Sequence, residues 1–134
     1  MSDTPVQTSG TVLCAPDCLL AADLPLDREP ILLLATAVLA LPKSGDAPPP
    51  QDCEQIGRLL AGHARLVADG VQGLCDRLPR GSSLRPLTET VLGEARGRLS
   101  VGPRPTVASA QNRARLVRIL YERLDRLTSA DSSA

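Results

Sequence analysis

A stretch of aliphatic residues with helical spacing constrains the fold of this chain more than any other feature. Between Pro50 and Pro79, apolar side chains recur every three or four residues and enclose the single histidine: Ile56, Leu59, Leu60, His63, Leu66, Val67, Val71, Leu74 and Leu78. This spacing predicts an amphipathic helix of about 40 Å at 1.5 Å per residue. Asp52 and Gln55 are expected to form a capping box at its start. Such a helix must pack its apolar side against other helices.

Three further segments predict helices that provide this packing surface. Asp27 is expected to cap a helix that contains the apolar run Ile31–Leu41, and Ser82 or Ser83 to cap a third helix. A fourth helix is expected over about residues 106–127. The inward residues of the last two helices are predicted to be Leu84, Leu87, Val91, Ala95 and Leu99, and Val107, Ala110, Ala114, Val117, Tyr121 and Leu124.

The composition also favours helices over strands. The chain has 134 residues, of which 43% are apolar, with one Tyr and neither Trp nor Phe, so its core must be aliphatic. We therefore predict an all-α fold, an antiparallel four-helix bundle over residues 25–128. Residues 1–24 lack periodicity and are predicted to be a mobile arm that can be deleted without loss of stability. Residues 129–134 are predicted to be a disordered tail.

Charge is balanced overall but unevenly distributed. The chain has 15 basic and 15 acidic residues; residues 1–50 carry a net charge of −4 and residues 51–134 one of +4, so the two parts are expected to attract each other. Zero net charge argues against a general nucleic-acid or membrane-surface binder. No apolar run approaches the roughly 20 residues that a membrane span needs. We therefore expect a cytoplasmic protein without a membrane partner.

The single histidine and the four cysteines are candidate chemical groups. His63 lies in an apolar stripe, where it is either an acid, base or ligand or, as we favour, a partly buried side chain hydrogen-bonded to a carbonyl or carboxylate. Cys14 and Cys18 have a spacing that suits two zinc ligands, but Cys53 and Cys75 are far away in sequence and no second pair exists. We predict reduced thiols, no disulfide framework, no metal, no cofactor and no catalytic residues.

Several charged residues are candidates for a polar network or an interaction surface. Glu94 and Arg98 are spaced for an ordinary surface pair. Arg113 falls on the apolar face of the last helix, so it is expected either to reach water at the end of the bundle or to pair with a carboxylate of the preceding, antiparallel helix, with Glu94 as the first choice. Arg115 and Arg118 lie on the outer face, either as a solvated surface or as a nucleic-acid footprint.

Three segments together resemble a known family. They are Gly62-His63-x-x-Leu66-Val67, Gly93-Glu94-Ala95-Arg96-x-x-Leu99, and the run from Ala110-Gln111 through Ala114-Arg115 and Val117 to Leu127. The resemblance covers about residues 51–128 and is to a small actinobacterial family of domains of unknown function, whose members are labelled natural-product-biosynthesis proteins. It implies a place near biosynthetic gene clusters and carries no catalytic residues. The chain departs from the pattern at Arg113, and its Tyr121–Arg123 stretch lacks a Cys-Asp-His-like triplet.

These observations favour a non-enzymatic module that binds a protein partner or a second copy of itself, in natural product biosynthesis or its regulation. The candidate interaction or polar-network residues are His63, Glu94, Arg113, Arg115 and Arg118. The alternative is a nucleic-acid-binding transcriptional regulator that uses the arginine-rich face of the last helix. An enzyme is the least favoured class, because no nucleophile, base and orienting group are recognisable together.

Overall fold

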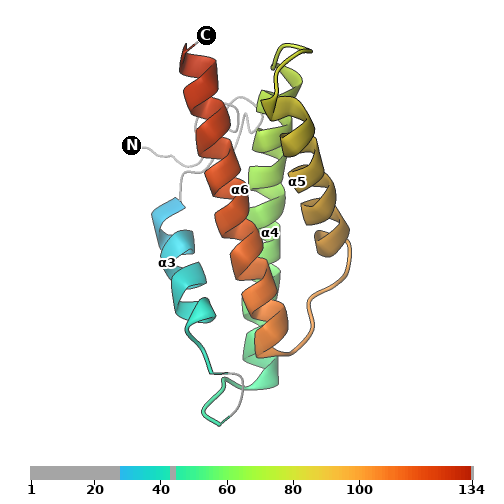
Figure 1. Cartoon of the computed structure of the whole chain (residues 1–134). Coiled ribbons are helices and arrows are strands. Elements are labelled where there is room, and N and C mark those ends of the chain that lie inside the picture. The colour runs from blue at the N-terminus through green and yellow to red at the C-terminus, as the bar shows by residue number, and fades with distance from the viewer. Residues whose placement is uncertain (1–27, 43–44, 134) are drawn as a thin grey trace, which may run out of the picture.

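The computed structural model describes residues 28–42 and 45–133, which form four helices. Helix α3 spans Arg28–Leu39, α4 spans Pro50–Asp76, α5 spans Leu84–Leu99 and α6 spans Val107–Ser133. Consecutive helices run in opposite directions (Figure 1), which confirms the predicted all-α, antiparallel four-helix bundle.

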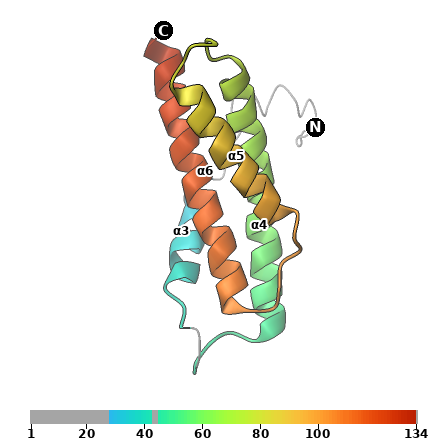
Figure 2. The ribbon, with the colours of Figure 1, turned by 45° about the vertical axis from the view of Figure 1, so that its right-hand side comes forward.

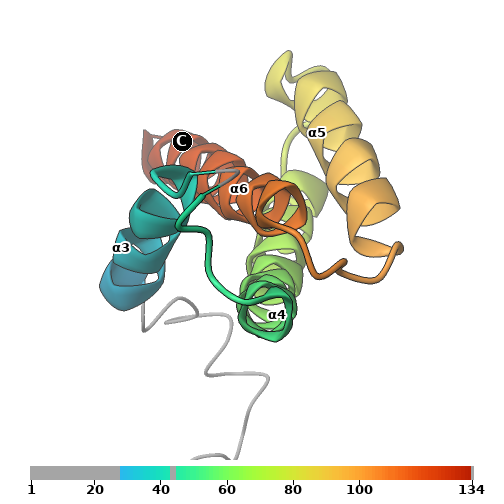
Figure 3. The ribbon, with the colours of Figure 1, turned by 90° about the horizontal axis from the view of Figure 1, so that it is seen from below.

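The helices are arranged around one central pair. α4 and α6 run in the same direction and pack most extensively, while α3 lies against α6 and α5 lies mainly against α4. Seen from below, α3 and α5 occupy opposite flanks of this pair (Figure 3). Figure 2 shows the oblique course of α5 relative to α6. The short connection between these two helices therefore does not make them close neighbours along their length.

Small side chains form the middle of the core. Four alanines of the central pair have no exposed surface: Ala64 and Ala68 on α4, and Ala110 and Ala114 on α6. The distance between packed helices depends on the side chains at their contact, so alanines permit a close approach. Branched aliphatic residues and Tyr121 fill the remaining space, which makes the core almost wholly aliphatic, as expected.

The starts of the helices agree only partly with the sequence. α4 begins at Pro50, so the predicted capping box at Asp52 and Gln55 is wrong. Its N-cap position is Pro49. Pro50 suits the first turn, because an N–H group at this position would have no acceptor within the helix and its absence in proline costs nothing. Asp52 instead lies within the first turn, where its charge favours the positive end of the helix. Ser83 occupies the N-cap position of α5 but makes no side-chain cap bond, whereas the Ser82 hydroxyl oxygen accepts a hydrogen bond from the Leu84 N–H group at 3.2 Å.

The last helix is longer than the sequence suggested. α6 continues to Ser133, so the prediction of a disordered tail is wrong for residues 129–133. No glycine or proline follows Leu127, and extending an existing helix costs far less than starting one. The predicted arm, the predicted cap Asp27 and the cysteines Cys14 and Cys18 lie outside the described residues.

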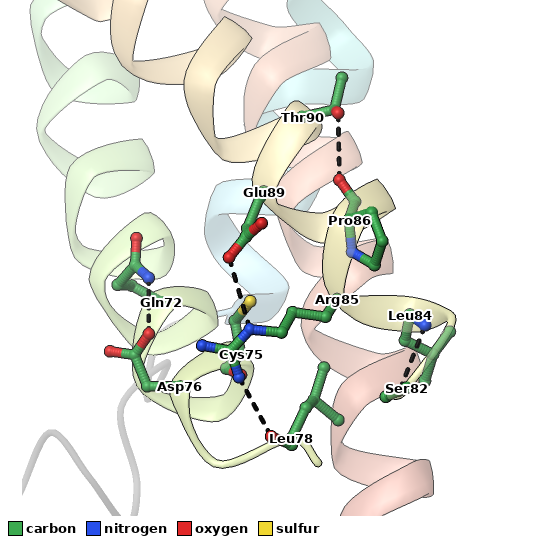
Figure 4. Close-up of polar contacts among 10 residues, drawn as sticks. All are labelled: Gln72, Cys75, Asp76, Leu78, Ser82, Leu84, Arg85, Pro86, Glu89 and Thr90. Atoms are coloured by element: carbon green, nitrogen blue, oxygen red, sulfur yellow. Dashed lines mark hydrogen bonds and ion pairs between the residues drawn. The ribbon is translucent and has the colours of Figure 1, made fainter. Parts of the chain in front are cut away.

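Long side chains from other helices bind the C-terminal ends of α3 and α4. Figure 4 shows Arg85, in the first turn of α5, donating to the carbonyl oxygens of Cys75 and Leu78 at 3.4 and 3.1 Å. Gln111 of α6 is buried, and its Nε2 atom donates to three carbonyl oxygens at 3.1 to 3.3 Å, those of Val38, Leu39 and Leu41. These bonds add side-chain donors to helix-end carbonyl groups, of which those of Val38 and Cys75 also accept the backbone N–H groups of Leu41 and Leu78.

Candidate functional site

His63 and Tyr121 meet between α4 and α6. The Nε2 atom of His63 lies 2.5 Å from the Tyr121 hydroxyl oxygen, and the ring centroids are 5.6 Å apart. Tyr121 is buried and His63 is partly buried. A buried phenol needs a polar partner for its hydroxyl group, and the only imidazole of the chain supplies it here. The predicted partly buried, hydrogen-bonded histidine is therefore confirmed, with a phenol in the place of the expected carbonyl or carboxylate.

Arg28 extends this contact to a third helix. Its guanidinium carbon lies 4.4 Å from the centre of the Tyr121 ring, which is the geometry of a cation–π contact. The same guanidinium donates to both carboxylate oxygens of Asp125, at 2.9 and 3.1 Å. Side chains of α3, α4 and α6 are thus joined at one level of the bundle. We call Arg28, His63, Tyr121 and Asp125 the polar cluster.

The sequence revealed only part of the polar cluster. His63 was a candidate, whereas Arg28 and Asp125 were not, because they are 97 residues apart and a bundle can bring them together in several ways. One signal was available: the only histidine and the only tyrosine occupy similar positions along two helices of the same direction. The cluster holds an imidazole, a phenol, a guanidinium and a carboxylate, and their contacts join three helices.

Arg113 is a residue of α6 that is only 6% exposed, and its guanidinium lies at the C-terminal end of α5. Its Nη2 atom donates to the carbonyl oxygen of Arg98 at 3.1 Å and also to that of Val101. Arg65 of α4 donates to the carbonyl oxygen of Leu99 at 2.9 Å. Burial, and then the positive charge of Arg65, lowers the pKa of the Arg113 guanidinium. Two arginines therefore bind the negative end of one helix.

The predicted surroundings of Arg113 are wrong on both alternatives. Its side chain does not reach water, and Glu94 is exposed and makes no hydrogen bond or ion pair within residues 28–42 and 45–133. Glu94 also forms no pair with Arg98 in that part of the chain. The reason is that carbonyl oxygens at the end of α5 lie within reach of the guanidinium and accept its hydrogen bonds.

Arg115 and Arg118 are exposed on the outer face of α6, as predicted. Arg126 lies farther along the same face, and Glu122 lies between Arg118 and Arg126. None of these three arginines has an ion pair in the described part of the chain. The structure thus brings His63 into the polar cluster and Arg113 into a helix-end contact, while Glu94, Arg115 and Arg118 remain separate surface residues.

Cys53 and Cys75 are buried free thiols. Burial, followed by the nearby carboxylate of Glu89, raises the pKa of the Cys75 thiol, which opposes formation of a reactive thiolate. Within the described residues, no group of three or more His, Cys, Asp or Glu side chains is placed to hold a metal ion. The described helices also include none that is long and apolar enough to cross a membrane.

Two leucines of α4 were predicted to be inward but are largely exposed. Leu59 is 57% exposed and Leu66 is 48% exposed, and His63 lies between them. The seven-residue spacing of the leucines places them on one face of the helix. We call Leu59, His63 and Leu66 the α4 stripe. The sequence could not separate this stripe from the buried face, because both are aliphatic and adjoin each other.

The comparisons with known proteins identify a family only. A family model described as a family of unknown function (DUF6415) matches residues 32–129, well over half of the chain. No curated protein and no solved structure matches the chain significantly.

Proposed function

The chain belongs to the DUF6415 family, and we propose that it is a non-enzymatic interaction module whose α4 stripe binds a helix of a partner protein. The exposure of Leu59 and Leu66 carries this proposal. Large apolar side chains gathered on one exposed face are typical of protein interaction sites. Their seven-residue spacing also matches the positions through which packed helices recognise one another.

The polar cluster supports a binding role for the stripe. His63 belongs to both, and its contact with Tyr121 fixes α4 against α6 at the middle of the stripe. Arg28 and Asp125 fix α3 at the same level. A face held by three helices loses little freedom on binding, which favours affinity.

The sequence resemblance suggests the setting of this interaction. Members of the resembled actinobacterial family are labelled natural-product-biosynthesis proteins, so the proposed partner is a cytoplasmic enzyme or regulator of such a pathway. This assignment of the setting depends on the resemblance, whereas the binding surface depends on the exposed leucines.

Affinity capture with matched variants tests the proposed surface. Leu59→Ser and Leu66→Ser should each reduce capture of a specific partner at least about tenfold, the effect of losing about 1.4 kcal/mol. Leu87→Ser is the control, because Leu87 is 50% exposed but lies on α5. Sedimentation over a range of concentrations shows whether the partner is a second copy. Equal capture by wild type and all three variants would contradict the proposed surface.

The exposed arginines of α6 support a second candidate, nucleic-acid binding. Arg115, Arg118 and Arg126 present three positive charges on one face, although Glu122 interrupts them. A DNA titration at increasing salt tests this function, since each neutralised phosphate contributes about −0.9 to the slope of log K against log salt. Arg115→Gln with Arg118→Gln should weaken binding and flatten the slope by about two phosphates. An affinity for DNA that changes neither with salt nor with these substitutions would contradict this candidate.

A further inference from the structure

The chain enters the bundle beside the α4 stripe. Arg28 is the first residue of α3, and it is held by the carboxylate of Asp125 and the ring of Tyr121. Tyr121 is hydrogen-bonded to His63, the middle residue of the stripe. The residues that precede Arg28 are therefore attached at the polar cluster, which shares His63 with the α4 stripe.

We propose that residues 12–26 of this chain cover the α4 stripe in cis, and that a partner helix binds the stripe only after they have left it. The displacement step rests on the proposed function. The docking of residues 12–26 does not rest on the proposed function, because it takes place within one chain.

The described helices leave the stripe open to such a segment. α3 packs against α6 and makes few contacts with α4, so α3 does not cover the exposed leucines. A Cβ atom added at Gly62, beside the stripe, would meet no atom of residues 28–42 and 45–133 within 4 Å. Leu59 and Leu66 therefore offer apolar surface, and its burial by an apolar segment is thermodynamically favourable.

Residues 12–26 have the composition and the reach to cover the stripe. Their aliphatic members are Val12, Leu13, Ala15, Leu19, Leu20, Ala21, Ala22, Leu24 and Leu26. A segment of this length extends to about 50 Å. Leu59 and Leu66 are separated by about 10 Å along the helix axis. The segment can therefore reach both leucines from its attachment at Arg28.

Charge adds to this attraction. Residues 1–27 contain four aspartates and neither Lys nor Arg, whereas the remaining residues contain 15 basic and 11 acidic side chains. An acidic, aliphatic segment thus precedes a basic bundle with an exposed aliphatic stripe. Attraction between opposite charges guides association and weakens with salt, so docking should be stronger at low ionic strength.

Covalent attachment makes the segment an effective competitor. A short tether gives it an effective concentration in the millimolar range, which a free partner must exceed in affinity. Deletion of residues 1–24 should therefore increase partner affinity and expose apolar surface. This expectation adds a binding role to residues for which the sequence alone predicted a mobile arm that can be deleted without loss of stability.

Hydrogen exchange of the full-length chain tests the docking. In the wild type, amides of residues 12–26 should exchange more slowly than unprotected amides. Leu66→Asp places a charge in the stripe and should accelerate their exchange about tenfold or to the unprotected limit. Leu87→Asp is the matched control on α5 and should leave their exchange unchanged. Unprotected amides in the wild type, or equal exchange in all three proteins, would overturn the docking.

Substitutions in the segment provide an independent test that leaves α4 intact. Leu19→Asp with Leu20→Asp should uncover the stripe and raise the binding of an apolar fluorescent dye, whereas Thr8→Asp with Ser9→Asp adds the same charge outside residues 12–26. Circular dichroism checks that helix content is retained. Equal dye binding by both double variants would also overturn the docking.

Partner capture then separates the two proposals. If Leu19→Asp with Leu20→Asp strengthens capture while Leu66→Asp abolishes it, both docking and displacement are supported. If the segment is protected in the wild type but its substitution leaves capture unchanged, displacement is overturned and docking stands. If exchange shows no protection while Leu66→Asp still abolishes capture, docking is overturned and the proposed function stands.

Discussion

Three long side chains, those of Arg85, Gln111 and Arg113, donate hydrogen bonds to carbonyl oxygens at the ends of other helices. The C-cap residues of α4 and α5, Arg77 and Ser100, are in the right-handed helical region. Neither helix therefore has the left-handed cap that often satisfies terminal carbonyl groups. A donor from another helix takes its place and couples the end of each helix to the packing of its neighbours.

Arg113→Leu should destabilise the protein by about 1 to 3 kcal/mol, because it removes the side-chain donor to the carbonyl oxygens of Arg98 and Val101 in a buried site, although the Arg98 oxygen keeps the backbone N–H of Val101. The sequence alone suggested a neutral or stabilising effect, since Arg113 occupies an apolar seam. Arg115→Leu is the control, because Arg115 is exposed two residues away and should change stability by less than about 0.5 kcal/mol. Urea denaturation measures both; equal, small effects would show that the helix-end contact contributes little.

Stability should fall in alkaline solution through Cys75, whose pKa is raised by burial and then by Glu89. Below about pH 8.5 the thiol is protonated in both the folded and the unfolded state. At higher pH the unfolded state releases a proton that the folded state retains, so the free energy of unfolding decreases by up to about 1.4 kcal/mol per pH unit. Cys75→Ala should remove this contribution to the slope. Urea denaturation from pH 7 to 10 measures it, and identical slopes in both proteins would contradict the assignment.

At the scale of single helices, the sequence predicted which segments form helices better than it predicted where these helices end and which residues they contact. The apolar period identified three helices, because burying one face of a helix requires that period, and the continuous apolar run Ile31–Leu41 identified the other. The predicted burial was wrong at Leu59 and Leu66 and also at Leu87, which is 50% exposed, since spacing gives a face but not the width of the surface that neighbouring helices cover. The sequence also failed at Arg113, whose partners are backbone atoms that carry no sequence signal. Of the polar cluster, His63 alone was foreseen, because its partners depend on how three helices pack.

Gln111 tests whether the end of α3 depends on α6. Gln111→Met keeps the size but removes the donor to Val38, Leu39 and Leu41, and it should cost about 1 to 3 kcal/mol. Gln111→Glu should cost more, because a carboxylate would then face carbonyl oxygens in a buried site. Gln72→Met is the control, since Gln72 bonds only to the neighbouring Asp76 at the surface. Hydrogen exchange should show the loss in the last turn of α3; an undisturbed last turn would argue against this cap.

The whole molecule is built around α4 and α6, and its two flanking helices have unequal roles. α3 contacts mainly α6 and leaves the α4 stripe open, whereas α5 contacts mainly α4. α4 itself packs against α6 and α5, and among the described helices none covers the side of α4 that carries Leu59 and Leu66. The uneven arrangement therefore creates the exposed apolar surface on which both the proposed function and the proposed docking of residues 12–26 depend.

Ala114→Leu tests this arrangement, because Ala114 has no exposed surface in the core between the central helices. Three additional carbon atoms would force α4 and α6 apart or push neighbouring side chains out of their preferred rotamers, at a cost of about 1 to 3 kcal/mol. Ala108→Leu is the matched control: Ala108 is exposed on the first turns of the same helix, so its substitution should change stability by less than about 0.5 kcal/mol. Urea denaturation of the two variants gives the comparison. Because the α4 stripe is positioned by the central pair, Ala114→Leu should also weaken partner capture at a temperature where the variant remains folded. A variant as stable as the wild type would mean that the two helices are not held in close contact by their alanines.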